Sequence, residues 1–109
     1  MDTVKDLLDA KGHEVYSVRP TATVYEALEL MAEKNLGAVM VVDDKNAVKG
    51  IFSERDYARK IIIKGRASRT TRVKEIMTPK VLYVDPSTPI RDCMSLMTGK
   101  RIRHLPVMD

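Results

Sequence analysis

The chain has 109 residues, of which 44% are hydrophobic and 31% are charged, and its net charge is +4. This length predicts one domain, or two small motifs that share a core. No apolar run approaches the roughly 18 residues of a membrane span, and the acidic N-terminus has no apolar segment of the kind found in signal peptides. The lone Cys93 excludes an internal disulfide and indicates a buried thiol in a reducing compartment, so we expect a cytoplasmic protein without a membrane partner.

The first residues predict a short helix and then an extended segment. Thr3 and Asp6 have the spacing of a capping box, so the helix is expected to begin at Thr3. Gly12 is suited to end this helix. Residues 15–18 are expected to be extended, and Pro20 closes that segment.

The next stretch predicts a helix followed by two strands. Apolar residues recur at i, i+3, i+4 and i+7 over 24–31, which is typical of an amphipathic helix, and Thr21 is a suitable N-cap. The continuous apolar run 38–42 predicts a strand that is covered on both faces. A turn at 43–46 leads into a second strand at 48–52.

A further helix is expected to run from Ser53, as its N-cap, through Ile63, with Gly65 just beyond its end. The segment 59–74 is basic and contains no acidic residue. Such a stretch is typical of a polyanion-binding surface, and also of a solvated helix end and linker, so both interpretations stay open. Its basic residues are Arg59, Lys60, Lys64, Arg66, Arg69, Arg72 and Lys74.

The chain repeats itself. Residues 3–8 match residues 72–77, and residues 15–43 align without a gap with residues 81–109. Nothing in the second copy corresponds to residues 44–63, so a strand and a helix are missing from it. We therefore expect either that the natural chain continues beyond the second copy or that another protomer supplies the missing strand.

The second copy predicts the same local elements as the first. Its apolar spacing over 90–97 is that of an amphipathic helix, with Ser87 as a suitable N-cap and Pro89 in the first turn. Residues 103–107 are expected to form its second strand.

Three short patterns stand in the repeated order. Residues 50–57 read glycine, two apolar residues and then Ser-x-x-Asp, residues 77–79 read Met-Thr-Pro, and residues 103–107 read Arg-His-Leu-Pro-Val. Together they resemble a tandem cystathionine-β-synthase (CBS) domain pair, and the nearest likeness is to small stand-alone bacterial signal-transduction proteins. The resemblance covers nearly the whole chain. It implies an α/β (α+β) fold of two pseudo-symmetric β-α-β-β-α repeats, over 1–68 and, incomplete, over 69–109.

The resemblance also implies a function. Many CBS pairs bind adenosine-containing ligands such as AMP, ATP, NAD-type and S-adenosyl compounds in clefts between the repeats, and pairs commonly dimerise. We therefore expect a regulatory homodimer that takes an adenine nucleotide as its ligand and requires no cofactor. The sequence contains no nucleophile–base set and no cluster of metal ligands, so we expect no enzyme, no catalytic residue and no metal site.

Ser53 and Asp56 are the residues whose chemistry suits such a ligand. An ionised carboxylate can accept hydrogen bonds from both hydroxyls of a ribose, and the start of a helix favours phosphate. We therefore expect Asp56 to hold the ribose and Ser53 to assist with ribose or phosphate. The same two residues also have the spacing of a capping box, in which Asp56 would only satisfy backbone N–H groups.

The resemblance assigns the rest of the site to the second copy and to the start of the apolar strand. Backbone near Val81 and Leu82 would meet the adenine edge, Ile102 would pack on the base, and Arg103 and His104 would reach phosphates. We expect one competent site, because the partner cleft would need a second Ser/Thr-x-x-Asp after Asp109. The candidate ligand-binding residues are Gly37, Ala38, Ser53, Asp56, Thr78, Lys80, Val81, Leu82, Ile102, Arg103 and His104.

Two other functions remain open at this point. The basic segment 59–74 could bind nucleic acid, in which case affinity would fall steeply with salt. The chain could also be a dimerisation module that acts on a partner without a ligand, which its seven methionines would tolerate.

Overall fold

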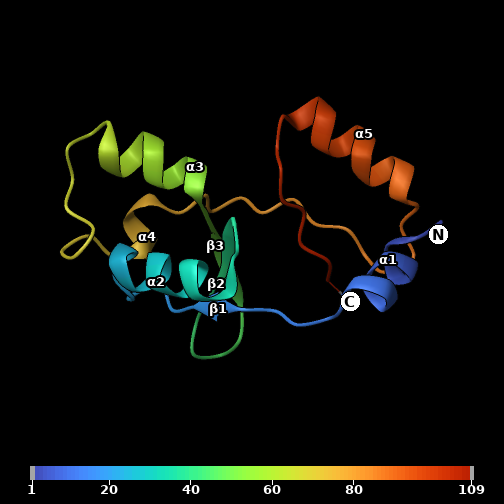
Figure 1. The fold of residues 1–109 in the computed structure, drawn as a ribbon, viewed down its shortest axis with the longest axis horizontal. Helices are drawn as coiled ribbons and strands as arrows, with labels where there is room; N and C mark the ends of the chain where they lie inside the picture. Colours follow the sequence, from blue (N-terminus) through green and yellow to red (C-terminus); the bar gives the residue numbers. More distant parts are fainter. Residues whose placement is uncertain (1, 109) are drawn as a thin grey trace. The chain divides into compact units, whose positions relative to one another are not determined.

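The apolar run Ala38–Val42 forms the central strand, β2, of a three-stranded sheet in the computed structural model, which describes residues 2–108 (Figure 1). β1 (Ser17–Val18) pairs with β2 in parallel, and β3 (Val48–Ser53) pairs with it in antiparallel. The predicted turn between β2 and β3 is confirmed, with the Asp43 carboxylate accepting from the backbone N–H groups of Lys45 and Ala47. The order of elements predicted for the first repeat is therefore confirmed.

The described residues divide into two units that do not follow the order of the chain. Residues 15–81 form one unit, here called the sheet unit, which contains β1, β2 and β3. Residues 2–14 and 82–108 belong to the other, here called the helical unit. The chain therefore passes between the units twice.

The hydrophobic core lies in the sheet unit. It forms between the sheet, the amphipathic helix α2 (Val24–Lys34) and the short helix α4 (Val73–Ile76). Phe52 on β3 is fully buried within it. The apolar spacing of α2 is confirmed, because its buried side chains repeat once per turn. The buried cluster comprises Val24, Ala27, Met31, Val39, Val41, Phe52, Ile61, Val73 and Ile76.

The structure corrects two details of these elements. The N-cap of α2 is Thr23 rather than Thr21, because Glu26 lies three residues after Thr23 and the two side chains form a reciprocal capping box. Strand β2 is not fully covered on both faces: Val39 and Val41 are buried, but the alternate positions are only half-buried. A continuous apolar run therefore does not mean here that both faces of the strand are fully buried.

The helix predicted from Ser53 begins there, with Ser53 as its N-cap. It is an α-helix only over α3 (Glu54–Asp56) and continues as a π-helix, η1 (Tyr57–Ile62). Gly65 follows with a positive φ of 68°, as expected of a residue just past a helix end. The wider π turn was not predicted, since local sequence carries no clear signal for it.

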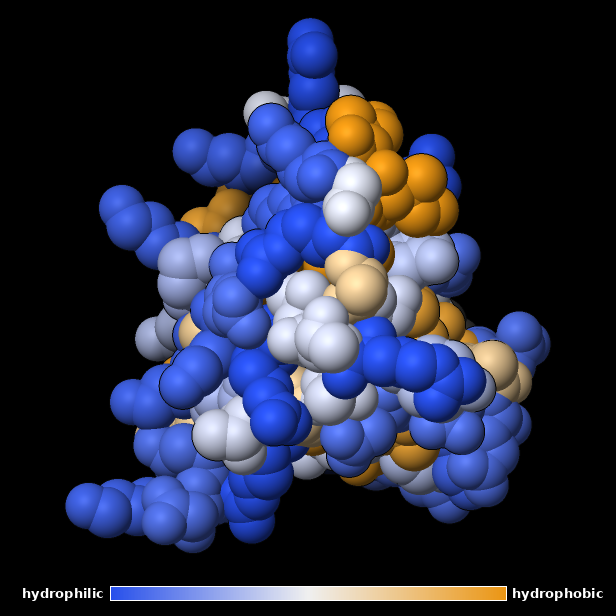
Figure 2. Space-filling model, turned by 90° about the vertical axis from the view of Figure 1, so that its left-hand side faces the viewer, coloured by the Kyte–Doolittle hydropathy of each residue, from blue (hydrophilic) through white to orange (hydrophobic). Residues whose placement is uncertain are grey.

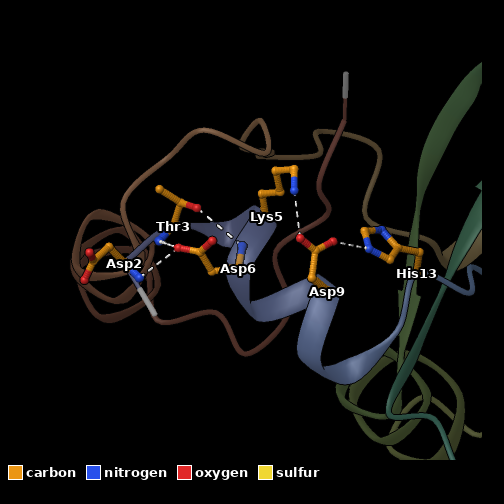
Figure 3. A network of polar contacts seen from close by, with 6 residues as sticks. All are labelled: Asp2, Thr3, Lys5, Asp6, Asp9 and His13. Atoms are coloured by element: carbon orange, nitrogen blue, oxygen red, sulfur yellow. Dashed lines mark hydrogen bonds and ion pairs between the residues drawn. The ribbon is translucent and has the colours of Figure 1, made fainter.

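In the helical unit, α1 (Val4–Lys11) begins at Thr3 and ends at Gly12, as predicted. The Thr3 hydroxyl accepts from the Asp6 N–H, while the Asp6 carboxylate accepts from the backbone of Thr3 (Figure 3). Farther along the helix, Asp9 holds Lys5 at 2.7 Å and His13 at 2.9 Å. Figure 3 shows these polar residues at the start of α1, along it and just past its end.

The helix α5 (Ile90–Lys100) confirms the amphipathic helix of the second copy but not its cap. Its N-cap residue is Pro89, which therefore precedes the first turn, and no side chain caps the helix. Ser87 is not the cap because its hydroxyl and backbone N–H both donate to the Asp85 carboxylate in the preceding turn.

The predicted strand at 103–107 is not formed. Among the described residues of the second copy, the corresponding backbone makes one isolated parallel bridge, between Val84 and Val107. In the first copy β2 gains most of its pairing from β3, whereas the second copy has no segment aligned with β3 within these 109 residues. Asp109, the last residue of the alignment, lies outside the described residues.

The backbone before each leading helix pairs with the backbone before the other repeat's main helix. Thr3, which precedes α1, bridges to Pro89 before α5, and Arg72, which precedes α4, bridges to Thr23 before α2. Thr3 aligns with Arg72, and Thr23 aligns with Pro89, so the same contact is made twice. The leading helices are thus exchanged between the repeats.

Cys93 is buried on α5. Burial, with a smaller effect of the neighbouring Asp92, raises the pKa of its thiol. The thiol is therefore protonated at neutral pH, in keeping with its expected role as a small apolar side chain. Across residues 2–108, no helix is long and apolar enough to cross a membrane.

The capping carboxylates predict how stability depends on pH. Backbone hydrogen bonds lower the pKa of Asp6 below its ordinary value of 3.8, and those of Glu26 and Glu75 below 4.5. Their contribution is therefore present above these ordinary values and is lost as the pH falls below them. We expect the free energy of unfolding to be steady above about pH 4.5 and to decline below it, as measured by urea denaturation across this range. A Glu26→Gln variant should show a shallower decline; an identical pH profile would contradict the assignment.

Candidate functional site

The carboxylate of Asp56 lies at the centre of the predicted site and accepts from four donors. Its Oδ2 accepts from the backbone N–H of Ser53 at 3.0 Å and from the Ser53 hydroxyl at 3.1 Å. Its Oδ1 accepts from the Thr78 hydroxyl at 3.1 Å and lies 3.0 Å from the Lys60 ammonium. Asp56 is 7% exposed, so this is a nearly buried carboxylate whose negative charge is balanced by one cation.

The capping box formed by Ser53 and Asp56 is present. The Ser53 hydroxyl accepts from the Asp56 N–H at 3.2 Å, in return for the bonds that Ser53 donates to Oδ2. Asp56 therefore caps α3 through Oδ2 and uses Oδ1 for other partners. The cap predicted from these two residues is therefore present, and it occupies only one oxygen of the carboxylate, while the ligand contact stays a prediction.

Thr78 reaches Asp56 because its backbone runs beside β3. Ile51 donates to the Thr78 carbonyl at 3.0 Å, and Thr78 donates to the Ile51 carbonyl at 2.9 Å. This close approach requires Gly50. A Cβ added at Gly50 would lie 2.7 Å from the Thr78 carbonyl oxygen and 2.8 Å from the Met77 sulfur. The glycine of the Gly-x-x-Ser-x-x-Asp pattern thus leaves the space in which the backbone of Thr78 lies against β3.

Gly37 and Ala38 lie at the same end of the sheet as the site. The Gly37 carbonyl accepts from the Glu54 N–H at 3.0 Å, at the start of α3. Ala38 is paired directly with Ser53 across β2 and β3. Five predicted residues are therefore brought together in the sheet unit: Gly37, Ala38, Ser53, Asp56 and Thr78.

The other predicted residues lie farther along the chain. Lys80 is exposed and Val81 is half-buried at the end of the sheet unit. The remaining four belong to the helical unit, where Ile102 is half-buried and donates its backbone N–H to the Met97 carbonyl at the end of α5. Their participation in one site with Asp56 stays a prediction. These four are Leu82, Ile102, Arg103 and His104, and all except Ile102 are exposed.

Sequence reasoning missed Lys60 as a member of the site, because it was counted in the basic segment. Besides its ion pair with Asp56, the Lys60 ammonium donates to the Ile76 carbonyl at 3.0 Å. The i, i+4 spacing of Asp56 and Lys60 on one helix was the available signal. Lys60 joins the carboxylate to the last residue of α4.

Much of the basic segment 59–74 is occupied by internal contacts. Arg66 pairs with Glu75 at 2.5 Å, the Arg69 guanidinium lies 3.8 Å from the centre of the Tyr25 ring, and Arg72 donates to the Thr21 carbonyl. Figure 2 shows the face formed by this end of the sheet unit as mostly hydrophilic, with apolar side chains gathered near its upper edge. These contacts favour the interpretation of the segment as a helix end and linker over that of a polyanion-binding stripe.

No group of three or more His, Cys, Asp or Glu side chains is arranged to hold a metal ion within residues 2–108. The groups around Asp56 supply hydrogen bonds and charge. With Asp56 itself, they present an anionic acceptor, two hydroxyls and an ammonium, which suit a polar ligand that carries hydroxyl groups.

A Gly50→Ala substitution is expected to destabilise the sheet unit and to disturb the site. The added methyl group would press on the backbone of Thr78, and overpacking of this kind costs about 1–3 kcal/mol. Thermal denaturation should show a lower midpoint than the wild type. Gly99→Ala is the matched control, because nothing lies within 4 Å of a Cβ at that position. Equal midpoints for the two variants would show that the close approach is not needed.

The geometry defines a class: a repeated α/β module with a buried carboxylate at the end of a sheet. The model of the CBS domain family matches residues 4–63 and again residues 73–109. The chain belongs to the CBS domain family, and as a CBS pair it is a regulatory module.

Relatives and solved structures agree with this assignment. The CBS domain-containing protein CBSX3, mitochondrial, of Arabidopsis thaliana is 41% identical over 97% of this chain, which spans 55% of that protein. A putative signal-transduction protein with CBS domains from Burkholderia ambifaria has a structure that matches with a TM-score of 0.93 at 51% identity, over 98% of this chain and 80% of that one. The chain thus spans about half the length of the first of these and most of the second.

The same fold occurs in more distant structures. The CBS domain pair of protein MJ0100, in complex with 5′-methylthioadenosine and S-adenosyl-L-methionine, matches with a TM-score of 0.86 at 23% identity. The match covers 98% of this chain and 80% of that one. At this identity the likeness concerns the fold.

Proposed function

We propose that this CBS pair is a sensor of an adenine nucleotide, such as AMP, ATP or an NAD-type compound, and that Asp56 accepts the ribose hydroxyls. The observation that carries the proposal is the Oδ1 atom of Asp56. It is held by two side chains, Thr78 and Lys60, rather than by the helix cap. An acceptor held only by side chains can exchange partners without unravelling the helix.

The chemistry of a ribose suits this oxygen. Two adjacent hydroxyls are donors, and an ionised carboxylate is the strongest acceptor among protein side chains. Hydrogen bonds to a charged group are worth about 1.5–3 kcal/mol each, which is enough to orient a nucleotide. The complex of the MJ0100 pair with two adenosine-containing ligands is a precedent for this ligand class on the same fold.

We assign further contacts by the family resemblance. In the sheet unit these are Gly37, Ala38, Ser53, Thr78, Lys80 and Val81. In the helical unit they are Leu82 and Ile102 toward the base and Arg103 and His104 toward phosphates. The chain acts through binding rather than catalysis in this proposal, with no cofactor, and one nucleotide binds per chain.

Ligand binding would regulate by shifting the population of two arrangements, to the extent that the ligand prefers one of them. We further propose that the module is a homodimer in a reducing compartment. A molar mass from light scattering that stays at 12.3 kDa at high concentration would rule out the dimer. Solved relatives include a hexameric CBS-CP12 protein, so the mass also tests a larger assembly.

A thermal-shift screen tests the proposal directly. A ligand that binds only the native state raises its stability by mass action, so an adenine nucleotide in large excess should raise the melting temperature. Adenosine, AMP, ATP and NAD should be compared with inorganic phosphate and with GMP. If no adenosine compound stabilises the protein, the proposed function is wrong. If all polyanions stabilise it equally and salt abolishes the effect, binding through the basic segment 59–74 is the better explanation.

A further inference from the structure

Lys60 is the cation that contacts Asp56, and it has two partners at once. Its ammonium lies 3.0 Å from Oδ1 of Asp56 and 3.0 Å from the carbonyl oxygen of Ile76. The Lys60 side chain is 41% exposed, whereas that of Asp56 is 9% exposed. The lysine therefore reaches the buried carboxylate from the solvent side, on a flexible stem that can swing away.

The carboxylate of Asp56 has no acceptor position to spare. A carboxylate offers about four lone-pair sites, and four donors already occupy them. The two donors on Oδ2 both come from Ser53 and form the helix cap, so displacing them would also weaken α3. The two donors on Oδ1, Thr78 and Lys60, are the ones that an incoming pair of hydroxyls can replace.

We propose that Lys60 selects for phosphorylated ligands by exchanging one anion for another. The inference rests on the proposed function of Asp56 as ribose acceptor. When ribose hydroxyls take Oδ1, the ammonium of Lys60 loses its anionic partner and, being 41% exposed, has only water in its place. A phosphate on the same ligand restores the pairing, whereas an unphosphorylated nucleoside does not.

Lys60 is suited to this exchange by its position as well as its charge. It lies one turn along the same helix as Asp56, so a ligand held by that carboxylate is within reach of the lysine. Neighbouring basic residues of the segment are committed elsewhere: Arg66 pairs with Glu75 and Arg69 stacks on Tyr25. The release of Lys60 also leaves the Ile76 carbonyl without this donor.

The test compares AMP with adenosine, which differ only in the phosphate. Calorimetric affinities of both should be measured for the wild type, for Lys60→Gln and for Lys60→Arg. In Lys60→Gln the preference for AMP over adenosine should fall about tenfold, while the affinity for adenosine is retained or improved because a competitor for Oδ1 is gone. Lys60→Arg keeps the charge and should retain the preference.

The matched control is Lys64→Gln, which removes the same charge four residues farther along an exposed part of the chain. It should leave the ratio of the two affinities unchanged. An unchanged ratio in Lys60→Gln, or an equal fall in both glutamine variants, would overturn the role of Lys60. If Lys60→Gln does not fold, the Lys60→Arg variant decides. A folded Lys60→Arg protein that no longer prefers AMP over adenosine would also overturn the role of Lys60. If the wild type binds neither compound, the proposed function itself fails instead.

Discussion

Replacing Asp56 with alanine is expected to abolish stabilisation by adenine nucleotides and to lower their affinity at least about hundredfold, since two hydrogen bonds to a charged acceptor are lost. The variant should also lose about 1–2 kcal/mol of folding free energy, because Asp56 is part of the capping box of α3. Lys60 would lose its anionic partner as well. Isothermal titration measures the affinity, and urea denaturation measures the free energy.

The loss of a cap must be separated from the loss of a ligand contact. Glu26→Ala is the matched control, because Glu26 closes the capping box of α2 in the same sheet unit. It should lower stability through the loss of its capping box and leave the nucleotide affinity within about twofold of the wild type. Should Asp56→Ala bind nucleotide as the wild type does, Asp56 is only a cap and the proposed site is wrong.

The fragment 15–81 is expected to fold, whereas the fragment 1–68, of nearly equal length, is expected not to. The first contains the whole buried cluster of the sheet unit, including Val73 and Ile76 of α4. The second lacks both, and it gains only α1, which belongs to the helical unit. Burying two such side chains contributes about 3–6 kcal/mol, comparable with the whole stability of a small domain.

Circular dichroism and hydrogen exchange of the two purified fragments would measure this difference. A Val73→Asp substitution in the fragment 15–81 places a charge in the core and should make it behave as 1–68 does, which isolates the contribution of α4. Stable folding of 1–68 on its own would show that the exchange of leading helices is not needed. In that case the repeat boundary in the sequence, rather than the spatial unit, would define the folding unit.

Much of the fold could be predicted because the signals are local. The capping box at Thr3 and Asp6, the strand at Ala38–Val42 and the turn after it all depend on neighbours within a few residues. Some errors arose where another residue competes for a side chain or where a distant strand is needed, and one arose although its signal was local. Thr21 was predicted as the N-cap of α2, although the capping box of Thr23 with Glu26 is visible in the sequence. Ser87 was predicted as the N-cap of α5, but its hydroxyl donates to the Asp85 carboxylate instead. The strand expected at 103–107 needs a neighbouring strand to pair with, and local propensity does not show whether one is present.

The candidate site was predicted only in part. Ser53 and Asp56 are paired as their spacing indicates. Thr78, which the family resemblance added to the site, contacts Asp56 in the structure, and its role in ligand binding stays a prediction. No local pattern could reveal that Gly50 allows that contact, because the steric limit comes from a segment nearly thirty residues later. Lys60 was overlooked because a single long side chain can serve either a solvated surface or a buried carboxylate.

The four-donor shell around Asp56 has a consequence for how the module would respond to metabolite levels. All the acceptor positions of this carboxylate are filled by donors of the protein itself. A ligand that binds to it must therefore first break hydrogen bonds that the ligand-free protein already makes. That cost raises the concentration at which half of the molecules are occupied and shortens the residence time. If the proposed function holds, the module would respond to changes in an abundant compound rather than to a scarce one.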